Sequence, residues 1–182
     1  MEKWISRIDE ITTKFLDSFG DLSIQDLNWK PDVQTWSIAQ NIDHLINLNR
    51  SYFPTFENLK KGRHDLPFIA RFGFVASFFG NMIKKSVDPG RQKKMKTFPI
   101  WEPSKSDLPK SILTDFQATQ EKLKGYISDS ADFIHQNMVI SSPVNRNIVY
   151  KLEMAFDIIV THEERHYNQA REVLSLLPKY ST

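Results

Sequence analysis

The stretch Thr161-His162-Glu163-Glu164-Arg165-His166-Tyr167 lies within a long run, Ile148 to Leu177, that contains no proline and no glycine. Apolar residues recur along this run at helical spacing, and the same stripe passes through His162 and His166. Side chains four residues apart lie on one face of a helix, about 6 Å apart along its axis. The three residues between the histidines are expected to point away from the centre of that face. The sequence therefore predicts a long helix that carries two imidazoles on its buried face.

This histidine pair has two interpretations. A single histidine on an apolar face is usually a core residue that is satisfied by hydrogen bonds, and a His-x-x-x-His spacing also occurs by chance. Two buried imidazoles one turn apart are nevertheless costly unless each finds a partner, and a metal ion suits two at this spacing. We favour the metal site.

The composition limits the class of protein. The 182 residues suit one domain spanning residues 1–182, and the hydrophobic content of 40% and charged content of 25% are ordinary for a soluble globular protein. A net charge of +2 calls for neither nucleic acid nor a membrane as partner. The absence of cysteine excludes disulfides, thiolate ligands and a cysteine nucleophile, and it agrees with a cytoplasmic location. The apolar stretch Phe68–Ile83 is too short to cross a bilayer.

Amphipathic periodicity predicts the helices. The predicted helical segments are residues 4–19, 38–61, 69–85, a segment from 107 or 108 to 127, and 148–177. Ser37 with Gln40 three residues later forms the signature of a capping box at the start of the second segment. Ser106 or Asp107 is predicted to cap the helix after the long connection, with Pro109 in its first turn.

The connections complete the predicted fold. Residues 86–109 contain four prolines and a basic cluster, which we interpret as a solvated loop; attraction of an anionic substrate is the alternative. The cluster consists of Arg91, Lys93, Lys94 and Lys96. Residues 128–147 are predicted to be a connection, and no segment shows the alternation of a strand. The predicted fold class is therefore all-α, a four-helix bundle with additional short helices and a long connection before the third main helix.

A metal needs more ligands than one histidine pair. Of the remaining histidines, His64 lies in a charged segment and His135 in a predicted connection, so both are expected to face solvent. His44 lies on the strongly patterned second helix, beside its apolar stripe, and ranks first as the third ligand. Facing helices of a bundle commonly supply metal ligands in this way.

Three short motifs resemble the signatures of one family. They are Trp36-Ser37-Ile38-Ala39-Gln40 with Asp43-His44-Leu45, then Lys96-Thr97-Phe98-Pro99 with Pro103-Ser104, and finally His162-x-x-Arg165-His166-x-x-Gln169. In this order and spacing they are similar to the DinB-like (YfiT-related) superfamily. The resemblance implies a four-helix bundle that holds a divalent metal through three histidines, which fall on His44, His162 and His166.

The resemblance also suggests an activity. The superfamily includes transferases and isomerases that depend on low-molecular-weight thiols, so we expect a metal-dependent, thiol-dependent S-transferase that acts on small electrophiles. The expected cofactors are one divalent metal ion, zinc or nickel, and a low-molecular-weight thiol as co-substrate. A metal-dependent hydrolase and a non-enzymatic helical binding module are the alternatives. Whether the chain forms a homodimer stays open.

Three further residues received interpretations. His162-Glu163-x-x-His166 also matches the H-E-x-x-H pattern of zinc proteases, but no downstream histidine follows. We interpret that match as coincidental and Glu163 as a solvated helix residue. Trp36, which immediately precedes the cap, is interpreted as a hydrophobic staple, in preference to a contact with substrate. Arg165 is expected to pair with glutamates on its own or a neighbouring helix.

Overall fold

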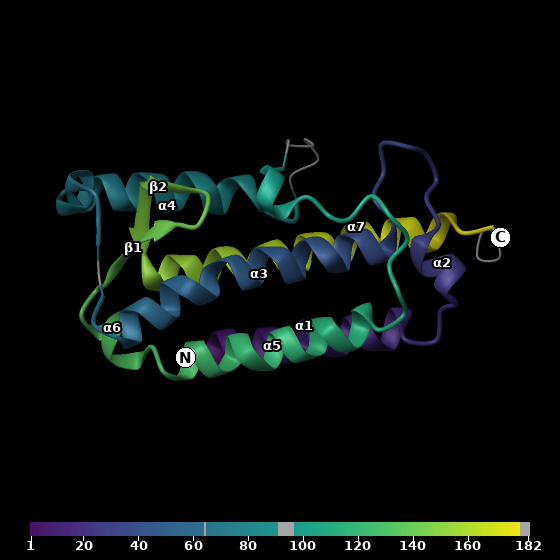
Figure 1. The fold of residues 1–182 in the computed structure, drawn as a ribbon, viewed down its shortest axis with the longest axis horizontal. Helices are drawn as coiled ribbons and strands as arrows, with labels where there is room; N and C mark the ends of the chain where they lie inside the picture. The colour runs from purple at the N-terminus through teal and green to yellow at the C-terminus, as the bar shows by residue number, and fades with distance from the viewer. Residues whose placement is uncertain (64, 91–96, 179–182) are drawn as a thin grey trace.

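Four long helices form the bundle. The computed structural model describes residues 1–63, 65–90 and 97–178. The four helices are α1 (Glu2–Phe19), α3 (Ile38–Lys60), α5 (Ile112–Ser128) and α7 (Leu152–Leu176). They contact one another in a closed ring, with α3 against α5 and α7, and α1 against the same two helices (Figure 1). This arrangement confirms the predicted four-helix bundle.

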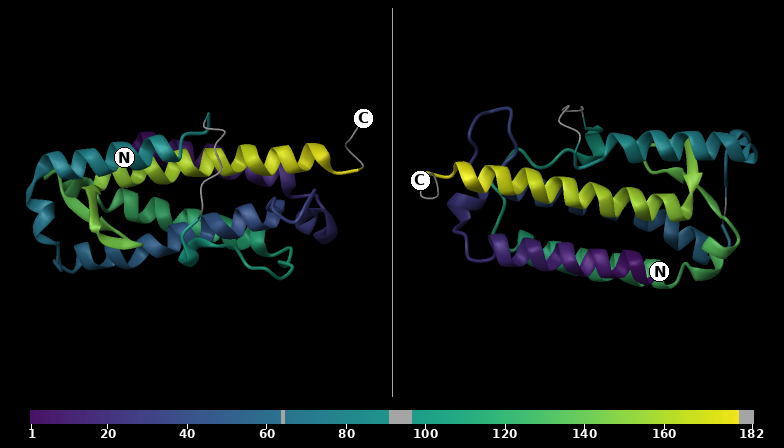
Figure 2. Two further views of the ribbon diagram at one scale, coloured as in Figure 1. Left: turned by 90° about the horizontal axis from the view of Figure 1, so that it is seen from above. Right: turned by 180° about the vertical axis from the view of Figure 1, so that it is seen from behind.

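Shorter elements connect the long helices. These are α2 (Ile24–Asn28), the 3-10 turns η1 (Phe68–Arg71) and η2 (Pro99–Trp101), α4 (Gly73–Ser86), α6 (Ala131–His135) and the strands β1 (Val139–Ser142) and β2 (Asn145–Lys151). Helix α4 lies outside the bundle, against β2 and α7, as the views in Figures 1 and 2 show. The long connection before α5 therefore contains η1, α4 and η2. The predicted basic cluster, residues 91–96, and His64 lie outside the described residues.

The prediction that the chain has no strands is wrong. Strands β1 and β2 form an antiparallel hairpin in which Ile140 faces Tyr150. As a result α7 begins at Leu152, and the last four residues before it belong to β2 rather than to the helix. Val149 and Tyr150 are buried in this strand, so their β-branched and aromatic side chains fit a packed sheet surface better than a helix.

The predicted start of the helix after the long connection is also wrong. Helix α5 begins at Ile112 with Ser111 as its N-cap, and neither Ser106 nor Asp107 caps it. The reason is a contact with α2: the side chain of Asn28 accepts from the Leu108 amide at 2.8 Å and donates to its carbonyl at 2.8 Å. These two bonds occupy the Leu108 backbone groups and hold this segment against α2, so the helix starts later.

A polar layer crosses the bundle between two apolar cores. One core runs from Trp4 through the second half of α3 to Val160, and the other runs from Ile11 through the first half of α3 to Val173. Between them, buried polar side chains come from every long helix. They are Thr12, His44, Asn49, Thr119, Gln120, Glu163, Arg165 and His166. The bundle thus keeps its polar groups together at mid-length.

The predicted capping box at Ser37 is present. The Ser37 hydroxyl accepts from the Gln40 amide at 3.1 Å, and the Gln40 side chain accepts from the Ser37 amide at 3.2 Å. Replacing Ser37 by Ala is expected to lower the free energy of unfolding by about 1–2 kcal/mol, because the Gln40 amide in the first turn of α3 loses its acceptor.

Chemical denaturation of the full chain tests this loss. Ser111→Ala is the matched control, since Ser111 occupies the N-cap of α5 but makes no side-chain capping bond. The control is expected to change stability by no more than about 0.5 kcal/mol. Equal losses in the two variants would contradict the assignment.

Candidate metal centre

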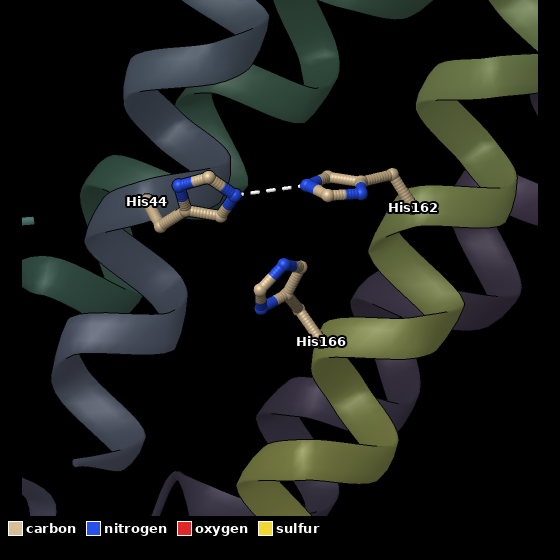
Figure 3. A group of neighbouring side chains, drawn as sticks. All are labelled: His44, His162 and His166. Carbon is tan, nitrogen blue, oxygen red and sulfur yellow. Dashed lines mark hydrogen bonds between the residues drawn. The ribbon is translucent and has the colours of Figure 1, made fainter. Parts of the chain in front are cut away.

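Helices α3 and α7 bring three histidines together. His44 comes from α3, and His162 and His166 come from consecutive turns of α7, with all three rings directed into the space between the helices (Figure 3). One nitrogen of each ring lies within 4.8 Å of the others. The ring centroids of His44 and His166 are 4.4 Å apart. The geometry therefore gathers the three histidines that the sequence selected, whereas His135 is exposed.

Two rings are oriented by hydrogen bonds on their outer nitrogens. Nδ1 of His44 donates to the backbone carbonyl of Trp101 at 2.6 Å, and Nδ1 of His166 donates to Oδ1 of Asn41 at 2.8 Å. Asn41 is itself fixed because its amide donates to the Ser37 carbonyl at 2.9 Å. Protons on both Nδ1 atoms leave Nε2 of both rings with a free lone pair. Such outer bonds are the usual means of fixing the tautomer of a metal-binding histidine.

The third ring completes the convergence. Nε2 of His162 lies 2.8 Å from Nε2 of His44, while its other nitrogen is buried without a hydrogen-bond partner. Ring nitrogens thus converge between the helices. A divalent cation there could accept all of their lone pairs, whereas an N–H···N bond joins only two rings. The donor set of three imidazoles fits zinc or nickel.

Burial keeps the three imidazoles neutral. Loss of solvent lowers the pKa of His44 to about 4, although its bond to the Trp101 carbonyl acts in the opposite direction. Burial also lowers the pKa of His162 and His166 well below the usual value, and the neighbouring imidazoles lower both further. A neutral ring is the form that binds a metal, so no proton needs to be displaced near neutral pH.

A cavity opens on the histidines. It has a volume of about 1080 Å³ and is lined by all three of them. Its wall also includes apolar and aromatic side chains from α3, α4, β2 and the loop around η2. They include Leu48, Tyr52, Met82, Phe98, Trp101 and Tyr150. This volume is enough for a drug-sized molecule.

Trp36 belongs to this cavity as well. Its indole is stacked on the His166 ring, with centroids 5.8 Å apart and planes 21° apart, and lies 5.0 Å from the His44 ring. Its interpretation as only a hydrophobic staple therefore missed a contact with the site. The position of Trp36 directly before the cap of the helix that carries His44 was the available signal.

Glu163 is buried, so its interpretation as a solvated residue is wrong. Its side chain points to the neighbouring helices, where it accepts from the Asn49 amide at 2.7 Å and from the Gln120 amide at 2.8 Å. The Asn49 amide also donates to the Gln120 carbonyl oxygen at 3.1 Å. Burial raises the pKa of Glu163 to about 7, although the two amide bonds lower it. Both carboxylate oxygens are therefore engaged by amides of α3 and α5.

Arg165 is also buried, and its guanidinium holds the end of α4. It donates to the Ser86 carbonyl at 3.1 Å and to the Asp88 carbonyl at 3.3 Å. Arg165 is thus buried against the segment after α4, a contact that the sequence pattern did not indicate. The residue fixes the segment that follows α4 to the helix that carries two of the histidines.

Comparison with known proteins agrees with this architecture. The family model of the DinB superfamily matches residues 7–170. The chain belongs to the DinB superfamily. Among solved structures, it is similar to YfiT from Bacillus subtilis, described as a probable metal-dependent hydrolase with an unusual four-helix bundle topology. The likeness covers 94% of this chain and 84% of that chain, with a TM-score of 0.60 and 14% sequence identity. At this identity it shows a common fold. No curated protein matches the chain significantly.

The network around Glu163 is expected to stabilise this DinB fold. Replacing Glu163 by Ala should lower the free energy of unfolding by roughly 2–4 kcal/mol, because buried amides of Asn49 and Gln120 lose their acceptor. Urea unfolding of the metal-free protein measures the loss.

The neighbouring residue supplies the control. Glu164 is partly exposed and pairs with Arg7 at 2.9 Å, so Glu164→Ala should cost less than about 1 kcal/mol. A Glu163→Ala protein as stable as Glu164→Ala would show that the buried carboxyl contributes nothing to the bundle.

Proposed function

We propose that the chain is a metal-dependent enzyme that acts on a small molecule. The observation that carries this proposal is the convergence of three neutral imidazoles, two buried and one half-buried, on a cavity of about 1080 Å³, with ligand atoms within 4.8 Å of one another. His44, His162 and His166 would bind one divalent ion, zinc or nickel. Three protein ligands leave at least one coordination position for substrate, as in catalytic rather than structural zinc sites.

The protein's own residues would prepare this site for the metal and the substrate. The Trp101 carbonyl and the Asn41 side chain hold two imidazoles with their Nε2 lone pairs turned inward. The apolar and aromatic wall excludes water from the same space and offers a surface to the substrate. When bound, the metal would supply Lewis acidity that lowers the pKa of a ligand.

We infer that the activated group is an external thiol, used for transfer to a small electrophile. The nearest carboxylate in sequence to the histidines, Glu163, is occupied by amides on other helices and is unavailable as a general base. The pKa of a free thiol is about 8.5, whereas that of bulk water is about 15.7. A metal therefore has to lower the pKa of a thiol much less than that of water to produce an anion at neutral pH. The chain contains no cysteine, so the thiol would come from a low-molecular-weight co-substrate.

Metal-dependent hydrolysis is the second candidate. It is favoured by the likeness to YfiT, which is described as a probable metal-dependent hydrolase. The same three histidines would serve, and water would take the place of the thiol.

Metal content tests the shared part of the proposal. Protein purified without a histidine tag is expected to contain one divalent ion per chain by elemental analysis. His44→Ala should lose most of that metal, because two histidines on one helix remain as ligands without the third from α3.

His135→Ala is the control for metal content, since His135 lies exposed at the end of α6. It should retain the full content. Equal loss in both variants would indicate adventitious binding. A metal-free wild-type protein would leave a non-enzymatic binding module.

A reaction panel separates the two chemistries. Glutathione, bacillithiol and mycothiol are offered with an electrophilic dye, with and without metal, and aryl esters are offered without thiol. We expect thiol consumption that depends on metal and falls by at least roughly a hundredfold in His44→Ala. Metal-dependent ester hydrolysis with no stimulation by thiol would instead establish the second candidate, and inactivity in both assays would contradict an enzyme of either kind.

A further inference from the structure

A cluster of exposed apolar side chains lies on η1 and α4. Phe74 is 75% exposed and Phe78 is 63% exposed, and Met82 follows four residues later on the same helical face. Phe68 and Phe72 on and just after η1 extend this cluster. We call these five residues the aromatic face. Contiguous exposed apolar surface of this kind marks a site of contact with a protein or a membrane.

The opposite side of α4 is already used in the fold. Ala76 and Gly80 are buried on that side. A Cβ atom added to Gly80 would lie 2.8 Å from Cγ of Met154 and 3.4 Å from Cβ of Tyr150, so the backbone of α4 presses closely on β2 and α7. Helix α4 is therefore packed on β2 and α7 through this side, and Figure 2 shows that it lies outside the bundle. The exposed side chains of the aromatic face lie away from this packed side, with Met82 at the edge where it also lines the histidine cavity.

Only cations accompany the aromatic face in its own segment. No aspartate or glutamate occurs from Leu66 to Val87. Arg71 is exposed, and its guanidinium lies 5.1 Å from the centroid of the Phe68 ring. At the other end of α4, exposed Lys85 follows Met82 by three residues and so continues the same helical face. The face thus has a positive charge at each end.

This distribution of charge disfavours a second copy of the chain as the occupant. In a two-fold dimer through antiparallel α4 helices, Arg71 of one copy would lie beside Lys85 of the other. With parallel helices, each of these cations would lie beside the same residue of the other copy. Like charges meet in either arrangement. The two carboxylates that border the segment are already engaged, Asp65 by Arg146 and Asp88 by the Gly90 amide. A surface that carries many negative charges removes this conflict.

We propose that the aromatic face docks on the surface of an anionic phospholipid bilayer. The phenylalanines would enter the boundary between headgroups and acyl chains, while Arg71 and Lys85 would contact lipid phosphates, as in interfacial amphipathic helices. No helix in the described ranges is long and apolar enough to span a bilayer, so the contact is peripheral. The proposal departs from the expectation of no membrane partner. That expectation rested on the small net charge of the whole chain and on the stretch Phe68–Ile83 being too short to cross a bilayer, and contact with the bilayer surface requires no crossing.

Co-sedimentation of the full chain with vesicles tests the proposal. Vesicles of phosphatidylcholine with phosphatidylserine are expected to bind the protein, vesicles of phosphatidylcholine alone to bind it more weakly, and added salt to weaken the binding. The double variant Phe74→Ser, Phe78→Ser should bind the anionic vesicles at least roughly tenfold more weakly, since two apolar side chains no longer leave water. Lys85→Glu should bind more weakly only to the anionic vesicles.

A matched variant controls for apolar exposure in general. Ile24 is 42% exposed on α2, outside the aromatic face, so Ile24→Ser should bind like wild type. Thermal unfolding of the double variant close to that of wild type verifies its fold, as expected for exposed positions. Absence of binding to anionic vesicles would overturn the proposal. A dimer in solution that dissociates in the double variant, together with absent vesicle binding, would assign the face to a second copy instead.

Discussion

The buried meeting of imidazoles from two helices is the contact around which the structure is arranged. The 2.8 Å approach of His44 and His162 joins residues that are separated by 118 positions in the chain. At such a distance, a slip of one helix by a single residue, about 1.5 Å, would destroy the convergence of lone pairs. The bundle must therefore fix α3 and α7 not only in position but also in axial register.

Three features of the bundle supply that register. The capping box begins α3 at a defined residue, less than two turns before His44. The loop around η2 then attaches to the same helix, since the Trp101 carbonyl accepts from His44 and the Trp101 indole donates to the Ser51 hydroxyl at 2.9 Å. On the far side of α7, Glu163 joins α3 and α5 through Asn49 and Gln120. Polar bonds are directional, so they determine register more strictly than apolar packing does.

Features that depend on neighbouring residues could be predicted from the sequence, and features that depend on contacts between distant residues could not. Helical periodicity and the capping box are local signals, and they predicted the four long helices and the start of α3. The histidine spacing and the family motifs selected all three members of the cluster. The hairpin was missed because Val149 and Tyr150 continue the apolar pattern of the following helix and take their conformation from tertiary packing. The hydrogen bond from His44 to the Trp101 carbonyl could not be predicted from the sequence, since every residue has a backbone carbonyl.

Glu163 shows why one helix can serve two purposes. Successive residues of a helix are rotated by about 100°, so His162 and Glu163 face different neighbours. An amphipathic pattern assigns one buried face and places the remaining side chains in solvent, but α7 contacts α1, α3 and α4 and is therefore buried over most of its circumference. Its histidines turn to the cavity, Glu163 turns to the bundle interior, and Arg165 turns to the end of α4. The polar layer replaces apolar packing at mid-length of the bundle, and the same layer positions the site. The stability of the bundle and the geometry of the site therefore depend on the same side chains.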